Sequence, residues 1–280
     1  MSGSKLDVVL KDLSIGYNGI PVVSDINVTL PAGKISVILG GSGCGKSTLL
    51  KHMLKLHPVL AGEIRIGGKN ILELNRHAWA CLKLRLGLLF QDGALLGSLT
   101  LGDNVALPLK EHTRLDKKTI QDMAVAKLAL VGLANYTHLY PNQLSGGMRK
   151  RAGLARAMVM DPDILFCDEP TSGLDPINSV ELDHLLLELK DRFNITIVVV
   201  SHDLASMRAI ADHVVMLGDG RVLFDGSMQD LEKTTDPYLR RFLDRIAEER
   251  TSPRLKALPL DPSMLKLNCA KYMASYGERE

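Results

Sequence analysis

A short glycine-rich segment constrains this chain more than any other part of its sequence. Residues 40–48 read GGSGCGKST and fit the pattern G-x-x-x-x-G-K-[ST]. An apolar strand is predicted directly before it, over Ile35–Leu39, and a helix directly after it, over Lys46–Leu56. This order predicts a loop whose backbone N–H groups converge on phosphate oxygens at a helix N-terminus. A chance glycine-rich turn is the alternative interpretation.

The loop predicts a nucleoside triphosphate site that uses Mg²⁺. Lys46 is expected to reach the β and γ phosphates, and the Ser47 hydroxyl is expected to bind the metal ion. The predicted nucleotide-binding residues of the loop are Gly40, Gly41, Ser42, Gly43, Cys44, Gly45, Lys46, Ser47 and Thr48.

Two adjacent carboxylates supply the second half of the predicted site. Asp168 and Glu169 follow the apolar run Ile164–Cys167, which indicates a buried strand. Ligands bind at the carboxyl edge of parallel sheets, so we expect Asp168 to hold Mg²⁺ through water. Glu169 is expected to accept a proton from the attacking water or to orient it. Two solvated loop carboxylates are the alternative.

The order of predicted elements indicates an α/β fold, a P-loop NTPase core whose parallel sheet is flanked by helices. Strands over Leu6–Tyr17 and Pro21–Leu30 suggest an N-terminal antiparallel β-subdomain, and residues of about 92–160 suggest an inserted α-helical subdomain. Strands and helices alternate again over residues 164–211, before a hairpin around Asp219 and Gly220. We therefore expect an ATPase domain over residues 1–250 and a C-terminal extension over 251–280.

Composition excludes several classes of protein. Among 280 residues, 46% are hydrophobic and the formal net charge is +2, which favours a globular chain without a broad attraction to nucleic acid. No apolar run approaches the roughly 18 residues that cross a bilayer, so we expect a cytosolic chain that reaches membranes through partners. The four cysteines form no CxxC pair, so neither disulfides nor a zinc site is expected.

Residues 144–148 carry a family resemblance. Their sequence, LSGGM, resembles the signature motif of ABC transporter ATPases, and the resemblance extends over nearly all of residues 8–231. Further family motifs occur in the family's order, at Tyr17, Gln91, Asp175 and His202. The resemblance implies that Tyr17 stacks on adenine, unless it is a core residue, and that Asp175 belongs to the D-loop.

The resemblance also implies roles for two further side chains. Gln91 is expected to contact Mg²⁺ or the attacking water, with an ordinary loop amide as the alternative. His202 is expected to hydrogen-bond to the γ-phosphate, with a satisfied buried histidine as the alternative.

By the same resemblance two copies of the chain pack head to tail. Ser145, Gly146 and Gly147 of one copy then complete the ATP site of the other. Met148 stands where the family usually has glutamine, which argues against a polar contact to ribose there. The basic residues that follow, 149–151, are expected to form a solvated helix face.

Residues 90–96 and 104–112 resemble the Mla or Mce type of ABC ATPase, which moves phospholipids between the inner and outer membranes of bacteria. This resemblance implies multi-span permease subunits, a periplasmic Mce-domain subunit, a small cytoplasmic regulatory protein and a peripheral position at the cytoplasmic face of the inner membrane. The alternatives are another ABC importer or exporter, or a soluble ABC ATPase. The leucine-containing tail, residues 251–280, is expected to add a dimer contact or to be a solvated appendage.

Overall fold

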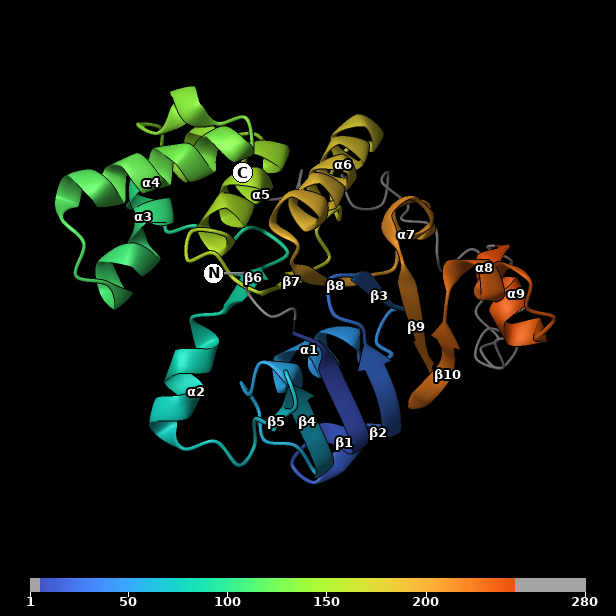
Figure 1. Cartoon of the computed structure of the whole chain (residues 1–280). Coiled ribbons are helices and arrows are strands. Elements are labelled where there is room, and N and C mark those ends of the chain that lie inside the picture. The colour runs from blue at the N-terminus through green and yellow to red at the C-terminus, as the bar shows by residue number, and fades with distance from the viewer. Residues whose placement is uncertain (1–5, 245–280) are drawn as a thin grey trace, which may run out of the picture. The chain divides into compact units, whose positions relative to one another are not determined.

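The computed structural model describes residues 6–244 of the chain (Figure 1). Contacts between Cα atoms divide the chain into a unit that ends at Leu239 and a second that begins at Arg240. All elements that carry the predicted site lie in the first unit, which is described below. The tail at residues 251–280 lies outside the described residues. No helix of residues 6–244 is both long enough and apolar enough to cross a bilayer.

A six-stranded sheet in the order β10-β9-β3-β8-β7-β6 forms the centre of this unit. Its strands are β3 (Ile35–Gly40), β6 (Leu86–Leu89), β7 (Ile164–Asp168), β8 (Thr196–Ser201), β9 (His213–Gly218) and β10 (Arg221–Gly226). The strands β6, β7, β8, β3 and β9 are parallel, and β10 pairs antiparallel with β9. Every residue of β3 and β8 is buried, as expected for parallel strands covered on both faces.

A second sheet, antiparallel throughout, has the order β2-β1-β4-β5. Its strands are β1 (Val8–Tyr17), β2 (Ile20–Leu30), β4 (Ala61–Ile66) and β5 (Lys69–Asn70). The turn between β1 and β2 consists of Asn18 and Gly19, with φ of 52° and 77°. Two left-handed residues in a two-residue loop match the twist of a hairpin. This turn leaves Tyr17 at the end of β1.

Helices cover both faces of the six-stranded sheet (Figure 1). On one face α1 (Lys46–Met53) contacts β3, β7 and β8 as well as β1 of the second sheet. Its Leu49, Leu50 and Met53 belong to a hydrophobic core shared by both sheets. The other face carries α6 (Pro176–Phe193), which contacts β8 and α7 (Leu204–Ile210). Three further short helices are α2 (Arg76–Lys83), α8 (Met228–Glu232) and α9 (Pro237–Leu243), of which α9 extends past Leu239, the end of the first unit.

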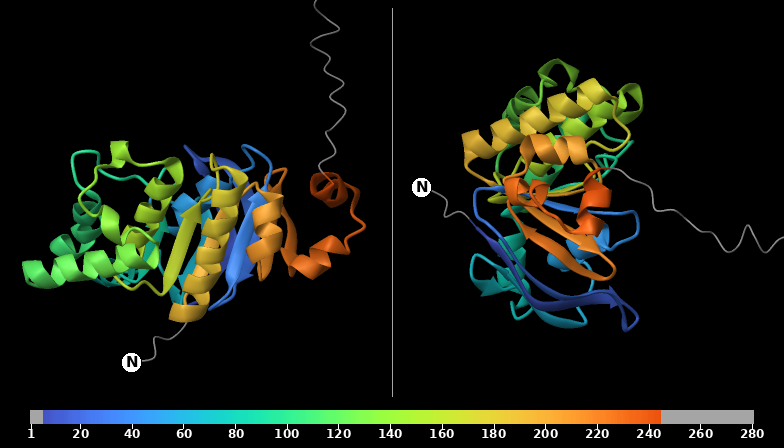
Figure 2. Two further views of the ribbon diagram at one scale, coloured as in Figure 1. Left: turned by 90° about the horizontal axis from the view of Figure 1, so that it is seen from above. Right: turned by 90° about the vertical axis from the view of Figure 1, so that its right-hand side faces the viewer.

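A group of helices is inserted between β6 and β7. It consists of α3 (Leu101–His112), α4 (Lys117–Leu130), α5 (Gly146–Ala157) and the 3-10 turns η1 (Ala134–Tyr136) and η2 (Pro141–Gln143). The three α-helices contact one another, and Figure 2 shows them gathered at the β6 end of the sheet. Helix α5 also contacts β6, so it joins the inserted group to the sheet.

The predicted fold class is confirmed: a parallel sheet flanked by helices, an antiparallel β-subdomain and inserted helices. Pairing brings the carboxyl ends of three strands to one edge, because Leu39 lies opposite Ser201 and Asp168 opposite Val200. The loops that follow β3, β7 and β8 therefore start side by side. They carry the phosphate loop, the two carboxylates and the predicted histidine.

Candidate functional site

The lysine of the phosphate loop, Lys46, hydrogen-bonds to the backbone of the loop itself. Lys46, at the start of α1, has only 7% of its surface exposed. Its Nζ donates to the carbonyl oxygens of Gly40 and Gly41, each at 2.9 Å. Gly45, just before the helix, has a φ of 102°, and a Cβ there would lie 2.6 Å from Val23. An ammonium group therefore lies against a loop at a helix N-terminus, where an anion is favoured.

Ser47 and Asp168, which were predicted to share a metal ion, lie together. Ser47 Oγ donates to Asp168 Oδ1 at 2.9 Å. Burial raises the pKa of Asp168 from its ordinary value, although the hydrogen bond from Ser47 opposes the rise. A hydroxyl and a half-buried carboxylate are oxygen donors of the kind that Mg²⁺ prefers, so these residues fit that ion.

Gln91, the other predicted metal contact, lies beside a different segment. It follows β6 closely, its side chain is exposed, and its Nε2 donates to Ser172 Oγ at 3.5 Å. Among the hydrogen bonds of the described residues, none joins Gln91 to Ser47 or Asp168. Gln91 therefore contacts the turn that follows β7, and its role as a metal contact stays a prediction.

Glu169 and His202 form a direct pair. Glu169 Oε2 lies 2.8 Å from His202 Nδ1, and the two side chains are 12% and 62% exposed. The N–H of Glu169 donates to the carbonyl of Val200 in β8 at 2.8 Å. A mostly buried carboxylate paired with an exposed imidazole is suited to act as a general base that a histidine orients.

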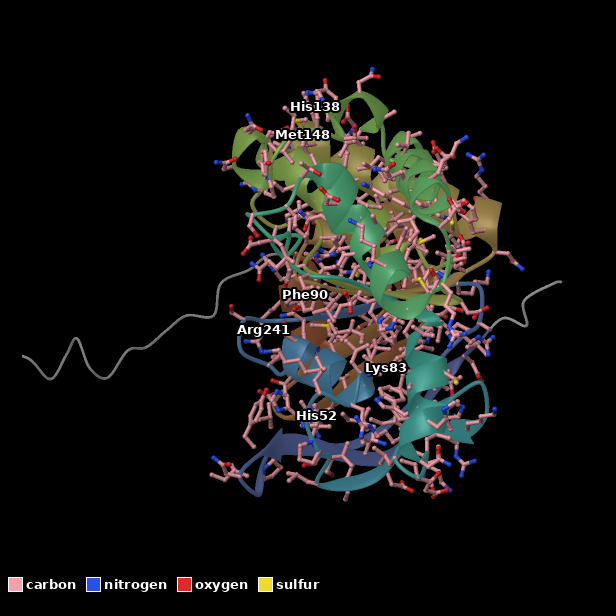
Figure 3. The ribbon with its side chains drawn as sticks, turned by 90° about the vertical axis from the view of Figure 1, so that its left-hand side faces the viewer. His52, Lys83, Phe90, His138, Met148 and Arg241 are labelled. Atoms are coloured by element: carbon pink, nitrogen blue, oxygen red, sulfur yellow. The ribbon has the colours of Figure 1, made fainter. Side chains whose placement is uncertain are left out.

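Tyr17 ends β1 with a partly exposed ring. The residue is 40% exposed, which argues against the alternative of a core side chain. Its ring meets His52 and His57 edge-on, with centroids 6.0 Å and 5.2 Å away. His52 of α1 (labelled in Figure 3) lies with Nδ1 2.8 Å from the carbonyl of Thr48. Tyr17 therefore lies beside the helix of the phosphate loop, and its exposed ring is suited to stacking on a purine.

The LSGGM segment forms the N-terminus of α5. Ser145 is exposed and caps the helix, because its Oγ accepts from the N–H of Met148 at 3.2 Å. Gly147 is buried against α6, where a Cβ would lie 3.1 Å from Asn178 Oδ1. No hydrogen bond within residues 6–244 joins residues 145–147 to the phosphate loop. The exposed start of α5 is therefore a place where an anion is favoured.

Asp175, the predicted D-loop residue, caps α6. Its Oδ1 accepts from the N–H groups of Ile177 and Asn178, both at 3.1 Å. A hydrogen bond from the Asn178 side chain lowers the pKa of Asp175 from its ordinary value. Because Asn178 also touches Gly147, the starts of α5 and α6 lie together. The sequence analysis did not identify this role of Asn178.

The structure corrects the expectation that Arg149, Lys150 and Arg151 form a solvated helix face. Lys150 is 5% exposed, and its Nζ donates to backbone carbonyls of the turn after β7. Helical spacing explains the burial, since Lys150 shares one face of α5 with the buried residues Gly147 and Leu154. That spacing was visible in the sequence, but three adjacent positive charges favoured a solvated face.

A groove of about 610 Å³ is bordered by α2, β6, α3 and the end of α5. Leu84, Leu107 and Pro108 contribute apolar surface to it. Its basic lining residues are His77, Lys83, His112 and Arg156. Among the described residues that line it, none is acidic. Figure 3 views the molecule from the side of α2 and α3, with Lys83 and Phe90 of this groove labelled.

Sequence comparisons relate this chain to known transport proteins. A family model described as ABC transporter matches residues 23–172. The chain is 41% identical over 241 residues to the intermembrane phospholipid transport system ATP-binding protein MlaF of Escherichia coli K12, covering 86% of this chain and 90% of that protein. It is 40% identical over 239 residues to the probable ribonucleotide transport ATP-binding protein mkl of Mycobacterium tuberculosis H37Rv, covering 85% and 67%.

Solved structures similar to this chain also include ATP-binding cassettes of ABC transporters. A dimeric structure of the ATP-binding cassette MJ0796 in a post-hydrolysis state, bound to ADP and Pi, is similar with a TM-score of 0.72 and 30% identity, covering 79% of this chain and 98% of that chain. The structure of cbiO1 from Clostridium perfringens, part of the ABC transporter complex cbiONQ, is similar with a TM-score of 0.75 and 27% identity, covering 90% and 98%.

Proposed function

The chain belongs to the ABC transporter family, and from this premise we propose that it is the ATP-hydrolysing subunit of a system that moves phospholipids between membranes. Its similarity to MlaF supports the phospholipid substrate, because the match spans 86% of this chain and 90% of the Escherichia coli protein. A relative of the same name in Haemophilus influenzae is 37% identical over 236 residues.

The pair formed by Glu169 and His202 carries the hydrolytic part of this proposal. Glu169 accepts a hydrogen bond from His202 Nδ1, so its carboxylate is held at the end of β7. From there it takes a proton from the attacking water. A second proton on His202, at Nε2, gives the imidazole a further N–H that can donate to a γ-phosphate oxygen.

The phosphates and the base of ATP have separate contacts in this proposal. Lys46 gives up its two carbonyl partners, Gly40 and Gly41, in exchange for the β and γ phosphates. Tyr17 stacks on adenine through its exposed face. Ser47 and Asp168 would hold Mg²⁺, which would supply positive charge against the phosphates.

A second copy of the chain completes each ATP site in this proposal. The start of α5, with Ser145 as its cap, is exposed, and no hydrogen bond within residues 6–244 joins it to the phosphate loop. A helix N-terminus favours an anion, and the γ-phosphate bound to another copy is one. The dimeric MJ0796 structures, 29–30% identical to this chain, support such a pairing.

The basic groove is the proposed contact with a multi-span permease. Its apolar lining residues, together with the basic residues His77, Lys83, His112 and Arg156, fit a short amphipathic helix that carries an acidic side chain. Phe90 lines the groove and directly precedes Gln91. A permease helix there would therefore touch the segment that carries Gln91, whose side chain contacts Ser172 in the turn after β7. Docking through this groove gives the chain a peripheral place at the cytoplasmic face of the inner membrane.

A ribonucleotide substrate is the second candidate. The mycobacterial relatives described as probable ribonucleotide transport proteins are 40% identical, close to the value for MlaF. The chain spans 67% of those relatives and 90% of MlaF, which favours the phospholipid system. Both candidates use the same ATPase, so only the transported molecule separates them.

Transport by a reconstituted complex tests the substrate. The tagged chain is purified with the membrane proteins that it retains in mild detergent, and the complex is placed in liposomes. We expect ATP to drive transfer of a fluorescent phospholipid between these liposomes and acceptor vesicles. The matched control is the same complex with Glu169→Gln, which should bind ATP without sustaining transfer. ATP-driven uptake of a radiolabelled ribonucleotide without phospholipid transfer would favour the second candidate.

A further inference from the structure

Lys150 is a nearly buried cation whose three N–H donors all have backbone partners. It lies in α5, is 5% exposed, and its Nζ donates to the carbonyl oxygens of Glu169 at 3.3 Å, Pro170 at 2.8 Å and Ser172. Burial lowers the pKa of Lys150, while the negative charges of Asp92 and Glu169 oppose that effect. An ammonium group has three donors, so this set of acceptors uses all of them.

The three carbonyls belong to one tight turn, residues 169–172, directly after β7. Glu169 begins the turn with a φ of 49°, which is uncommon for a residue with a side chain. The N–H of Ser172 closes the turn on the carbonyl of Glu169 at 3.2 Å. Three carbonyl dipoles that point to one place repel one another, and the Lys150 ammonium offsets that repulsion. Lys150 therefore favours this conformation of the turn.

The same turn sets the position of the carboxylate that pairs with His202. Three hydrogen bonds hold the backbone of Glu169: its N–H donates to the carbonyl of Val200, and its carbonyl accepts from the N–H of Ser172 and from Lys150 Nζ. Without Lys150 the carbonyl of Glu169 keeps only the N–H of Ser172, and the carbonyls of Pro170 and Ser172 lose this donor, so the turn can shift and displace the Glu169 side chain. A displacement of about 1 Å at a reacting group can slow catalysis about 100-fold.

We propose that Lys150 is a positioning residue for ATP hydrolysis, which holds residues 169–172 so that Glu169 is aimed at the attacking water. This inference rests on the proposed function, in which Glu169 is the general base. Lys150 and Ser145 belong to one helix, so Lys150 also links the start of α5 to the carboxylate of its own chain. If contact with a second copy shifts α5, Lys150 moves with the helix and displaces the turn that carries Glu169.

Lys150→Met removes the three donors and keeps most of the side-chain volume. We expect kcat to fall about 10- to 100-fold, because Glu169 loses its alignment, while the Kd for ATP stays near the wild-type value. Lys150→Arg keeps a cation with several N–H donors and should restore part of the rate. Lys127→Met is the matched control, since Lys127 is 9% exposed but pairs with Asp161 in another part of the chain. This control should leave kcat unchanged.

A double-mutant cycle separates positioning from a general structural role. Because Lys150 acts through Glu169, adding Lys150→Met to Glu169→Gln should slow hydrolysis no further than Glu169→Gln alone. A multiplicative loss would overturn the proposal. Loss of ATP binding in Lys150→Met, with a Tm far below that of Lys127→Met, would also overturn it, since Lys150 would then be a structural residue.

The cycle also distinguishes failure of this inference from failure of the proposed function. An inactive Glu169→Gln beside a fully active Lys150→Met would remove the role of Lys150 and leave the base assignment intact. A fully active Glu169→Gln would overturn both, because Lys150 would have no base to position.

Discussion

Lys46 holds the phosphate loop together through two backbone carbonyls. Its Nζ bonds to Gly40 and Gly41 keep the ammonium inside the loop, where 7% of the residue is exposed. A phosphate that enters the loop meets a cation already in place, so little side-chain entropy is lost on binding.

Replacing this lysine tests the nucleotide site directly. Lys46→Ala removes one buried, charge-assisted contact, which is worth about 1.5 to 3 kcal/mol. We expect ATP affinity to fall about 10- to 100-fold. Equilibrium titration with ATP measures the change, and Lys51→Ala, an exposed lysine of the same helix, is the control. Wild-type affinity in Lys46→Ala would contradict the assignment of the loop.

Residue patterns predicted the proximity of Ser47 and Asp168, but not the contacts of Lys150. The first pair lies at the carboxyl ends of two predicted parallel strands, and such ends meet at one edge of a sheet. The acceptors of Lys150 are backbone carbonyls of a turn, which any residue type could supply. Their position depends on how α5 packs against that turn. Side-chain chemistry therefore predicts only those contacts in which both partners are side chains.

Helix α5 and the segment after β6 approach each other through two glycines. A Cβ on Gly153 would lie 2.8 Å from the Cα of Gly93, and one on Gly93 would lie 2.7 Å from the carbonyl of Arg149. Arg156 Nη2 donates to the carbonyl of Gly93 at 2.8 Å, which fixes the segment on the helix. The segment that begins with Gln91 is therefore attached to α5 by backbone contact.

Gly93→Ala should separate these two elements. The new methyl group would meet the backbone of Arg149, and Gly93 has a φ of 75°, which is unfavourable for alanine. We expect the free energy of unfolding in urea to fall by about 1 to 3 kcal/mol. Gly97→Ala is the control, because a Cβ there has no atom within 4 Å. Equal stabilities of the two variants would show that the contact between α5 and this segment is loose.

Element boundaries differ from the sequence prediction where capping and pairing decide them. Within the helical subdomain predicted over residues of about 92–160, α4 (Lys117–Leu130) begins where it does because Asp116 caps it by accepting from the N–H groups of Lys118 and Thr119. The helix predicted over Lys46–Leu56 ends at Met53. The strand β6 has only four residues, which is too short for a period to be read, and it exists through pairing with β7.

At the scale of the whole molecule, two ATP sites in a pair of chains would each need a phosphate loop from one copy and an LSGGM segment from the other. The chain has one phosphate loop and one LSGGM segment, and α5 begins with an exposed Ser145. If two copies enclose two ATP molecules, each γ-phosphate is bound by Lys46 of one copy and by the start of α5 of the other. ATP should then favour the dimer, and hydrolysis should release it.

Two variants should separate binding, closure and hydrolysis in this cycle. Glu169→Gln cannot accept the proton of water, so we expect ATP hydrolysis to slow about 100-fold or more while a closed, ATP-bound dimer accumulates. Ser145→Arg places a large side chain at the helix N-terminus, so it should bind ATP and remain monomeric. Sedimentation velocity with and without ATP, together with bound nucleotide and released phosphate, measures all three steps.

Asn142→Arg is the control for the added bulk and charge, because Asn142 is exposed on η2, just before the start of α5. It should dimerise with ATP as the wild type does. A Glu169→Gln variant that stayed monomeric at saturating ATP would contradict a site completed by a second copy. So would a Ser145→Arg variant that closed normally, since the start of α5 would then lie away from the bound phosphate. Lys46→Ala should form no dimer in either case, because closure follows ATP binding.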